Sequence, residues 1–257
     1  MFCIIQLERV ERVCVSLSSN SVQPNRRRFH QSGWISSILS KAVAFWLQSQ
    51  AESVEQLEVY IQAQHQDLFG GKIPQVTLKA THGIYQGLHL SQINLKATQI
   101  RTNLSQVLKG KPLQLLEPIN VVCQLTITQT DLNASVSVPL LANALRDILQ
   151  PWLQSEVVMQ FIQDLSIQYI TLSAQNLIIK GTVICNRESY PFQLQTQLQI
   201  HHAQILVLTE AILTIKPEIM AVKIKDYSLD LGSSVKIQSL ILESQSLRLQ
   251  GDIQVNP

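Results

Sequence analysis

The feature that most constrains this chain is the alternation of apolar and polar residues along most of its length after residue 50. The stretch Phe192-Gln-Leu-Gln-Thr-Gln-Leu-Gln-Ile200 shows it most clearly, with Gln at nearly every second position. Successive side chains of a β-strand point to opposite faces, so this period of two indicates half-buried strands. Gln makes up about one residue in eight. The pattern therefore predicts a two-faced sheet with a neutral, wet side and an aliphatic, dry side.

The same alternation predicts many strands, separated by turn signals at Gly70-Gly71, Gly83, Gly87 and Lys109-Gly110-Lys111-Pro112. The strands expected before residue 130 cover 57–63, 76–80, 88–90, 93–97 and 121–127. Those expected after residue 166 cover 167–174, 177–183, 192–200, 205–213, 222–231, 235–242 and 247–255.

Two zones have a helical period instead. Between Trp34 and Gln50 the apolar residues fall within one half of a helical wheel, which predicts an amphipathic helix about 25 Å long. A second helical zone is expected to begin near Asp131 as its N-cap, with Pro139 at the start of a helix. Pro151 should break this zone or start a new turn, and 152–162 should form a short further helix.

An internal repeat also stands out. Residues 170–183 align without gaps on residues 240–253, with Gln175 matching Gln245 and Gly181 matching Gly251. Each copy indicates a strand, a tight turn at the Gln and a second strand that is bent at the Gly. A hairpin used twice favours a sheet that is extended as a meander.

Composition excludes several functions. The 257 residues are 46% hydrophobic and 15% charged, with a formal net charge of +2, so neither a disordered chain nor a nucleic-acid partner is expected. Residues 1–33 carry five Arg and two Glu, so the basic character lies at the N-terminus. We expect 1–33 to be a disordered or non-native extension and 34–257 to form one domain. Arg26, Arg27, Arg28 and Lys41 could contact an anionic membrane surface, although a solvated tail, or a start codon placed too early, is the favoured explanation of the arginines.

The sequence shows no catalytic or metal-binding motif. Cys3, Cys14, Cys123 and Cys185 have no metal-ligand spacing, and no nucleophile motif, phosphate-binding loop or dinucleotide fingerprint is present. We therefore expect no enzyme activity, no metal and no cofactor. Neither a convincing signal peptide nor an apolar run of about 20 residues is found, so no transmembrane helix is expected.

Several segments resemble a known family. They are residues 35–50, Gly71-Lys-Ile-Pro-Gln-Val76, Ile84-Tyr-Gln-Gly-Leu-His-Leu90, residues 107–118 and Asp131-Leu-Asn-Ala-Ser-Val136. These look like the LmeA-like phospholipid-binding family in its cyanobacterial branch. The resemblance implies an envelope- or membrane-associated protein without enzyme activity. It also implies a curved sheet similar to the folds of tubular lipid-binding and bactericidal/permeability-increasing proteins.

The fold that we predict is a β-rich α+β domain, in which a long, curved antiparallel sheet forms a half-pipe with amphipathic helices on its concave face. The function that we predict is non-catalytic phospholipid binding or transfer by a peripheral protein at a membrane surface or in the cell envelope. The compartment, cytoplasmic side or envelope, stays open. The candidate lipid contacts are Trp34, Ile38, Val43, Phe45, Trp46, Phe192, Leu194 and Leu198.

Two other functions compete with this prediction. A membrane-associated scaffold or assembly factor could bind a protein partner through a sheet edge or a helix face, because strand edges with few charges favour β-augmentation. A hydrolase acting on lipid-linked substrates would need a Ser or Asp within hydrogen-bond reach of His82 or His89 in a cleft.

Overall fold

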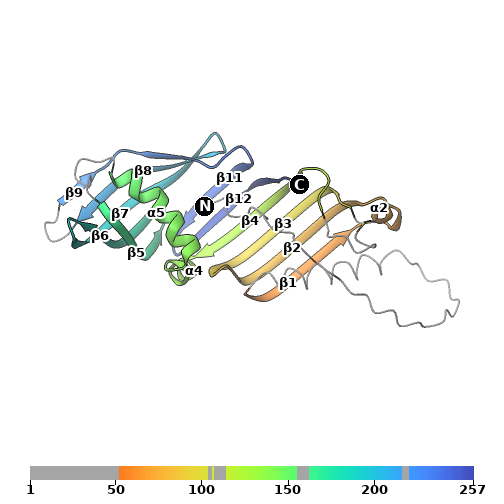
Figure 1. The fold of residues 1–257 in the computed structure, drawn as a ribbon, viewed down its shortest axis with the longest axis horizontal. Coiled ribbons are helices and arrows are strands. Elements are labelled where there is room, and N and C mark those ends of the chain that lie inside the picture. The colour runs from red at the N-terminus through yellow and green to blue at the C-terminus, as the bar shows by residue number, and fades with distance from the viewer. Residues whose placement is uncertain (1–51, 104–105, 107–113, 155–161, 216–219) are drawn as a thin grey trace.

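The chain folds into two antiparallel sheets that lie end to end, with helices at their junction (Figure 1). The computed structural model describes residues 52–103, 106, 114–154, 162–215 and 220–257. The Trp34–Gln50 segment lies outside these residues, as does the whole of 1–33. Within the described part, the β-rich class and the antiparallel pairing are confirmed, but the strands form two sheets and not one.

Sheet 1 has the strand order β1-β2-β3-β4-β12-β11, and every neighbouring pair is antiparallel. The first four strands begin this sheet, and the hairpin β11-β12, which follows sheet 2 in the sequence, completes it. The elements of this sheet, with the short helix α2, are β1 (Ser53–Gln62), α2 (His65–Phe69), β2 (Lys72–Tyr85), β3 (Leu88–Arg101), β4 (Ile119–Thr128), β11 (Val235–Glu243) and β12 (Ser246–Val255).

Sheet 2 is formed by the part of the chain between β4 and β11. Its strand order is β10-β8-β7-β6-β5, and the short β9 also pairs with β8. The predicted strand over 222–231 is therefore wrong, because the chain divides there into two short strands. The strands are β5 (Ile162–Ser173), β6 (Asn176–Cys185), β7 (Glu188–His201), β8 (Ile205–Ile215), β9 (Met220–Lys223) and β10 (Tyr227–Asp230).

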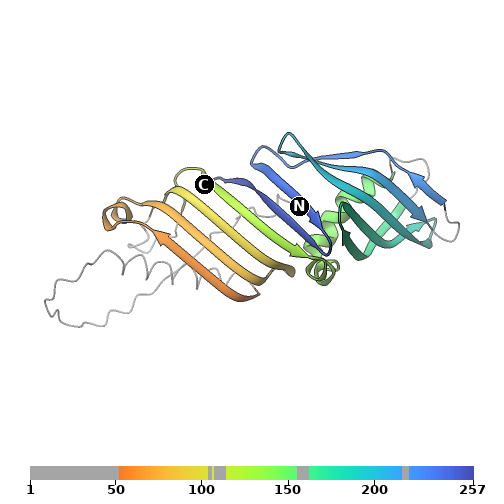
Figure 2. The same cartoon turned by 180° about the vertical axis from the view of Figure 1, so that it is seen from behind.

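Helix α5 (Pro139–Gln154) covers one face of sheet 2, as the reverse view shows (Figure 2). It starts at Pro139 as predicted, but it continues through Pro151, contrary to the sequence prediction. Pro151 is exposed, so water can hydrogen-bond the carbonyl group that the missing N–H leaves free. The buried side of α5 packs Leu149, Trp152 and Leu153 into a core with Phe192 and Leu194 of β7.

The short helix α4 (Gln129–Ser135) precedes α5 at the junction of the sheets. Its N-cap is Thr128 and not Asp131, which corrects the predicted boundary. Asp131 occupies the third helical position, where its carboxylate accepts the backbone N–H of Thr128 at 2.8 Å while its own N–H donates to the Thr128 hydroxyl at 3.1 Å. This reciprocal pair is a capping box in which Asp replaces the usual Glu.

The internal repeat corresponds to two equivalent hairpins, β5-β6 and β11-β12. Gln175 and Gln245 occupy the same turn position with φ of 75° and 67°. In each hairpin the pairing register shifts by one residue opposite the repeated glycine, Gly181 or Gly251. A Cβ on Gly181 would lie 2.1 Å from the Ser166 carbonyl oxygen, and one on Gly251 would lie 2.5 Å from that of Lys236. Both glycines are therefore required for close approach of the bulged strands.

Candidate functional site

The apolar face of sheet 1 is the most distinctive surface of the described chain. Strand pairing aligns three parallel rows of residues on it, and each row crosses all six strands. Every position is apolar, counting Cys123 and Gly251. The rows are Leu57-Ala80-Ile93-Leu125-Leu249-Leu240, Val59-Leu78-Leu95-Cys123-Gly251-Ile237 and Ile61-Val76-Ala97-Val121-Ile253-Val235.

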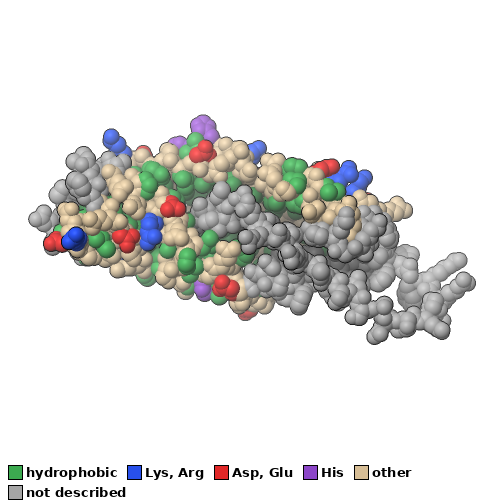
Figure 3. Space-filling model, viewed as in Figure 1, with side chains coloured by type: hydrophobic (Ala, Val, Ile, Leu, Met, Phe, Trp, Pro, Cys, Tyr) green, Lys and Arg blue, Asp and Glu red, His purple; other side chains and the backbone are tan. Residues whose placement is uncertain are grey.

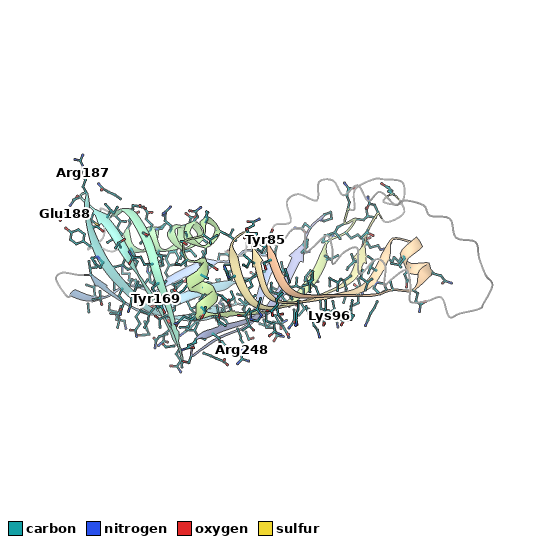
Figure 4. All side chains as sticks on the ribbon, turned by 90° about the horizontal axis from the view of Figure 1, so that it is seen from below. Tyr85, Lys96, Tyr169, Arg187, Glu188 and Arg248 are labelled. Atoms are coloured by element: carbon teal, nitrogen blue, oxygen red, sulfur yellow. The ribbon has the colours of Figure 1, made fainter. Side chains whose placement is uncertain are left out.

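The opposite face of the same sheet is polar. Between the apolar rows lies the row Glu58-Lys79-Asn94-Gln124-Gln250-Ser239, which has one acidic and one basic residue among six. Lys96 and Arg248 belong to this side too and project away from the ribbon (Figure 4). Figure 3 shows the other side of the molecule, where charged side chains are scattered among uncharged ones wherever described residues are visible. The structure thus confirms the predicted division into a wet side and an aliphatic side.

Described residues cover the apolar face unevenly. At the sheet junction, Ile93 and Leu125 pack against a core cluster that includes Leu132 and Leu141 of the two helices. At the far end, Ile61 packs with Leu68 of α2. Five residues of the face belong to none of the clusters of described residues, and their side chains are half-buried. They are Leu57, Leu78, Leu95, Val121 and Ile253.

Cys123 lies at the middle of the central row and is 4% exposed. Burial raises the pKa of its thiol, so it is a poor nucleophile at neutral pH and acts as a small apolar side chain. Cys185 of β6 is half-buried and is also a free thiol whose pKa burial raises. Within the described part of the chain, no group of three or more His, Cys, Asp and Glu residues could hold a metal ion.

A pocket of about 480 Å³ lies at the end of sheet 1 nearest α2. Its polar lining includes Asp67, Lys72, Arg101 and Glu117, and the guanidinium Nε of Arg101 lies 3.6 Å from Oε1 of Glu117. The Leu116 N–H donates to the Arg101 carbonyl at 2.9 Å, which fixes the segment that carries Glu117 beside the end of β3. The pocket therefore presents two cations and two anions on a hydrogen-bonded frame.

Helix α4 joins the two sheets through polar side chains on two of its sides. Toward sheet 2, Asn133 accepts the N–H of Ile170 and donates to its carbonyl, both at 2.8 Å, and Gln129 accepts the N–H of Leu172 at 2.8 Å. Toward sheet 1, the Ser135 hydroxyl accepts the backbone N–H of His89 at 2.8 Å. Because β5 is an edge strand, some of its backbone groups have no neighbouring strand, and helix α4 provides their hydrogen-bond partners.

Asp131 completes the contact of α4 with sheet 1. Its carboxylate accepts a short hydrogen bond from the Ser91 hydroxyl and two bonds from Thr128. Burial acts to raise the pKa of Asp131, but the hydrogen bonds from Ser91 and Thr128 and the nearby His89 outweigh it, so the pKa is lowered. Asp131 is therefore held ionised as a structural group.

Among the described residues, neither histidine of the hydrolase hypothesis makes a side-chain hydrogen bond to a Ser or Asp. His82 pairs with Glu55 at 2.7 Å, and both side chains are about two-thirds exposed, at 67% and 65%. His89 meets Ser135 through its backbone N–H and not through its imidazole. Neither histidine activates a nucleophile through these contacts.

The predicted lipid contacts fall into two groups. Phe192 and Leu194 are buried and Leu198 is half-buried, and all three belong to the core between sheet 2 and α5. Trp34, Ile38, Val43, Phe45 and Trp46 lie outside the described residues, as do Arg26, Arg27, Arg28 and Lys41. The structure thus brings together the three strand residues, but within a packed protein core.

Sequence reasoning missed the lateral alignment of the apolar rows and the charged pocket. The alternating strands revealed which residues share a face of one strand, but the pairing register decides which residues become neighbours across strands. The turn at Gln86-Gly87 could have set the register of β2 and β3, because both residues have positive φ, as a two-residue hairpin requires.

The fold and this face define an elongated, two-sheet β protein with one long aliphatic surface. A family model described as LmeA-like phospholipid-binding matches residues 31–252, and the chain belongs to that family. The description names phospholipid binding and no catalytic activity. Searches of curated proteins and of solved structures gave no match. None of the described helices is long and apolar enough to span a membrane.

Proposed function

We propose that the protein binds phospholipid without catalysis, with the acyl chains lying on the apolar face of sheet 1. The observation that carries this proposal is the set of three complete apolar rows, in which Leu57, Leu78, Leu95, Val121 and Ile253 belong to none of the core clusters of described residues. Acyl chains need aliphatic walls and no specific polar partner, and this face supplies such a wall across six strands.

The dimensions of the face suit such a ligand. Six strands about 4.8 Å apart span roughly 24 Å, and the outer rows are about 13 Å apart along the strands. This face of about 300 Å² could contribute at most about 8 kcal/mol at roughly 25 cal/mol per Å², before the cost of association. Once about 4 kcal/mol of association cost is deducted, roughly 4 kcal/mol remains, which corresponds to about millimolar binding, so tighter binding requires contacts beyond this face.

The proposal includes finer features that the family description does not specify. Sheet 1 would be curved as a half-pipe with helices on its concave side, as in tubular lipid-binding proteins, and the chain would belong to the cyanobacterial branch. The protein would act peripherally at a membrane surface or in the cell envelope, where it could transfer lipid between membranes. A protein that carries lipid on the apolar face of sheet 1 still presents the polar face to water, and this favours a role in lipid transfer.

Organic extraction of the purified full chain, followed by mass spectrometry, is the first test. We expect co-purifying phospholipid, and we expect flotation with liposomes. A phospholipid with a photoreactive group in its acyl chain should then label peptides that contain Leu78, Leu95 or Val121. Labelling confined to residues of the polar face would contradict the proposal, as would the absence of both extracted lipid and flotation.

Matched variants on β3 separate the two faces. Leu95→Asp places a carboxylate at the centre of the apolar face, and Asn94→Asp places the same group on the neighbouring residue of the polar face. We expect the first to reduce lipid binding at least tenfold, because desolvating a carboxylate costs several kcal/mol, and the second to leave binding unchanged. Circular dichroism of both variants checks the fold. If Leu95→Asp fails to fold, Leu95→Asn is the milder substitution.

A further inference from the structure

The pocket at the α2 end of sheet 1 combines unpaired charge with a shaped recess. Lys72 at the start of β2 and Arg101 at the end of β3 are direct cross-strand partners, so their side chains leave the sheet together. Arg101 is paired with Glu117. Lys72 has no ion-pair partner among the residues that the structure describes. Asp67 of α2 contributes a second carboxylate to the lining.

Part of the lining of this pocket is apolar and borders the third apolar row. Ile73 and Ile100 line the pocket and are buried in one cluster with Ile61. Val76 and Ala97, which are members of the third apolar row, pack against the same cluster. From Ile73 to Ala80 along β2 is seven residues or about 23 Å, and one leaflet of a bilayer core is about 15 Å thick. An acyl chain that starts at the pocket can therefore lie entirely on the face.

We propose that this pocket holds the headgroup of the bound phospholipid, which rests on the phospholipid binding proposed above. The phosphodiester lies against Lys72 and Arg101, and the acyl chains run from there along β2 and β3 toward the sheet junction. Ammonium and guanidinium groups form charge-assisted hydrogen bonds with phosphate oxygens, and the cross-strand pair offers both types of donor at one site.

The carboxylates make the pocket selective for the group beyond the phosphate. Asp67 and Glu117 balance the two cations, so the lining carries no net charge and does not favour anionic lipids by charge alone. Carboxylates accept hydrogen bonds from hydroxyl or primary ammonium groups. A choline has no such donor and is usually held by an aromatic cage, and the described lining residues include no aromatic side chain. The pocket therefore fits a phosphodiester whose headgroup carries hydrogen-bond donors.

Calorimetric titration with water-soluble, short-chain lipids tests this assignment on the full chain. The ligands are dihexanoyl phosphatidylglycerol, phosphatidylethanolamine and phosphatidylcholine, together with free glycerol phosphate and phosphoethanolamine. We expect glycerol and ethanolamine lipids to bind about fivefold to tenfold more tightly than the choline lipid. The free phosphate esters should bind much more weakly than the lipids, because they lack acyl chains.

Three variants test which side chains of the pocket contact the lipid headgroup. Lys72→Gln should weaken all three lipids about fivefold to tenfold. Glu117→Gln should remove most of the preference over choline. Lys79→Gln, an exposed lysine on the polar face of the same strand, is the control and should bind like wild type. Thermal unfolding shows whether each variant folds, and the exposed positions of Lys72, Glu117 and Lys79 favour folding.

The results of these titrations distinguish failure of the headgroup site from failure of the proposed phospholipid binding. Lipid binding with no effect of Lys72→Gln, or with choline bound as tightly as the other lipids, overturns the headgroup site and leaves phospholipid binding standing. Absence of lipid binding overturns both. Binding of free phosphate esters through Lys72 without lipid binding identifies a site for soluble esters and refutes the lipid assignment.

Discussion

Asn133 provides the sharpest test of how the two sheets are held together. Its amide makes two hydrogen bonds to the backbone of Ile170, and Ile170 is only 2% exposed. Asn133→Ala would leave one buried N–H and one buried carbonyl of β5 without these partners. At about 1–3 kcal/mol for each unsatisfied group, the loss in unfolding free energy is roughly 2–6 kcal/mol, with water entry favouring the lower end.

The matched control is Thr130→Ala in the same helix. Thr130 is exposed, and alanine has the higher helix propensity, so this change should alter stability by no more than about 0.5 kcal/mol. Urea unfolding followed by circular dichroism gives both values. Hydrogen exchange supplies a local measurement, because the Ile170 amide should exchange faster in Asn133→Ala while amides within β2 keep their protection.

A small loss of unfolding free energy in Asn133→Ala would refute this reasoning. If Asn133→Ala and Thr130→Ala differ by less than about 0.5 kcal/mol, the side chains of α4 do not determine the attachment of β5. If the Ile170 amide also keeps its protection, another group must satisfy it.

Three further predictions concern the repeat, the capping residue and the thiols. Gly251→Ala should cost about 1–3 kcal/mol, measured by urea unfolding, because its Cβ meets a backbone oxygen, whereas Gly83→Ala should be tolerated because its nearest contact is 4.0 Å away. The lowered pKa of Asp131 means that its stabilisation is present above its ordinary value of 3.8 and is lost as the pH falls through the folded-state value. The difference in unfolding free energy between wild type and Asp131→Asn should therefore shrink on acidification, and a difference independent of pH would contradict this. Iodoacetamide should alkylate Cys123 more slowly than Cys185 in peptide mapping, since Cys123 is the more buried thiol; equal rates would show that the central apolar row opens readily.

Much of the fold could be predicted because alternation directly reflects the two faces of a strand. The expected strand over 235–242 corresponds to β11, and that over 247–255 to β12. The helix boundaries were less accurate. Asp131 has the side chain of an N-cap, but Thr128 three residues earlier could form a reciprocal bond with it. Local sequence does not decide between these arrangements, because each satisfies a free N–H of the first turn.

The candidate site was less predictable than the fold. Phe192 and Leu194 are on an apolar strand face, as expected, but α5 covers that face. Leu78 and Leu95 show the same alternation and lie on the other sheet. Periodicity identifies an apolar face without identifying what packs against it, and that depends on contacts between distant parts of the chain.

The division into two sheets follows from the repeat that the sequence already contained. Each copy places its bulged strand, β5 or β11, at the edge of its own sheet. A bulge adds twist and interrupts the hydrogen-bonding ladder, so two bulged edges are poor partners for each other. They meet instead through single contacts: the Gln245 N–H donates to the Leu172 carbonyl at 3.2 Å, and α4 satisfies the neighbouring groups. The hairpin repeat, from which the sequence predicts one continuous meander, therefore ends each sheet, and the apolar rows of sheet 1 stop at β11. The acyl ligand that we propose for this face would consequently be bounded by the junction at one end and by the charged pocket at the other.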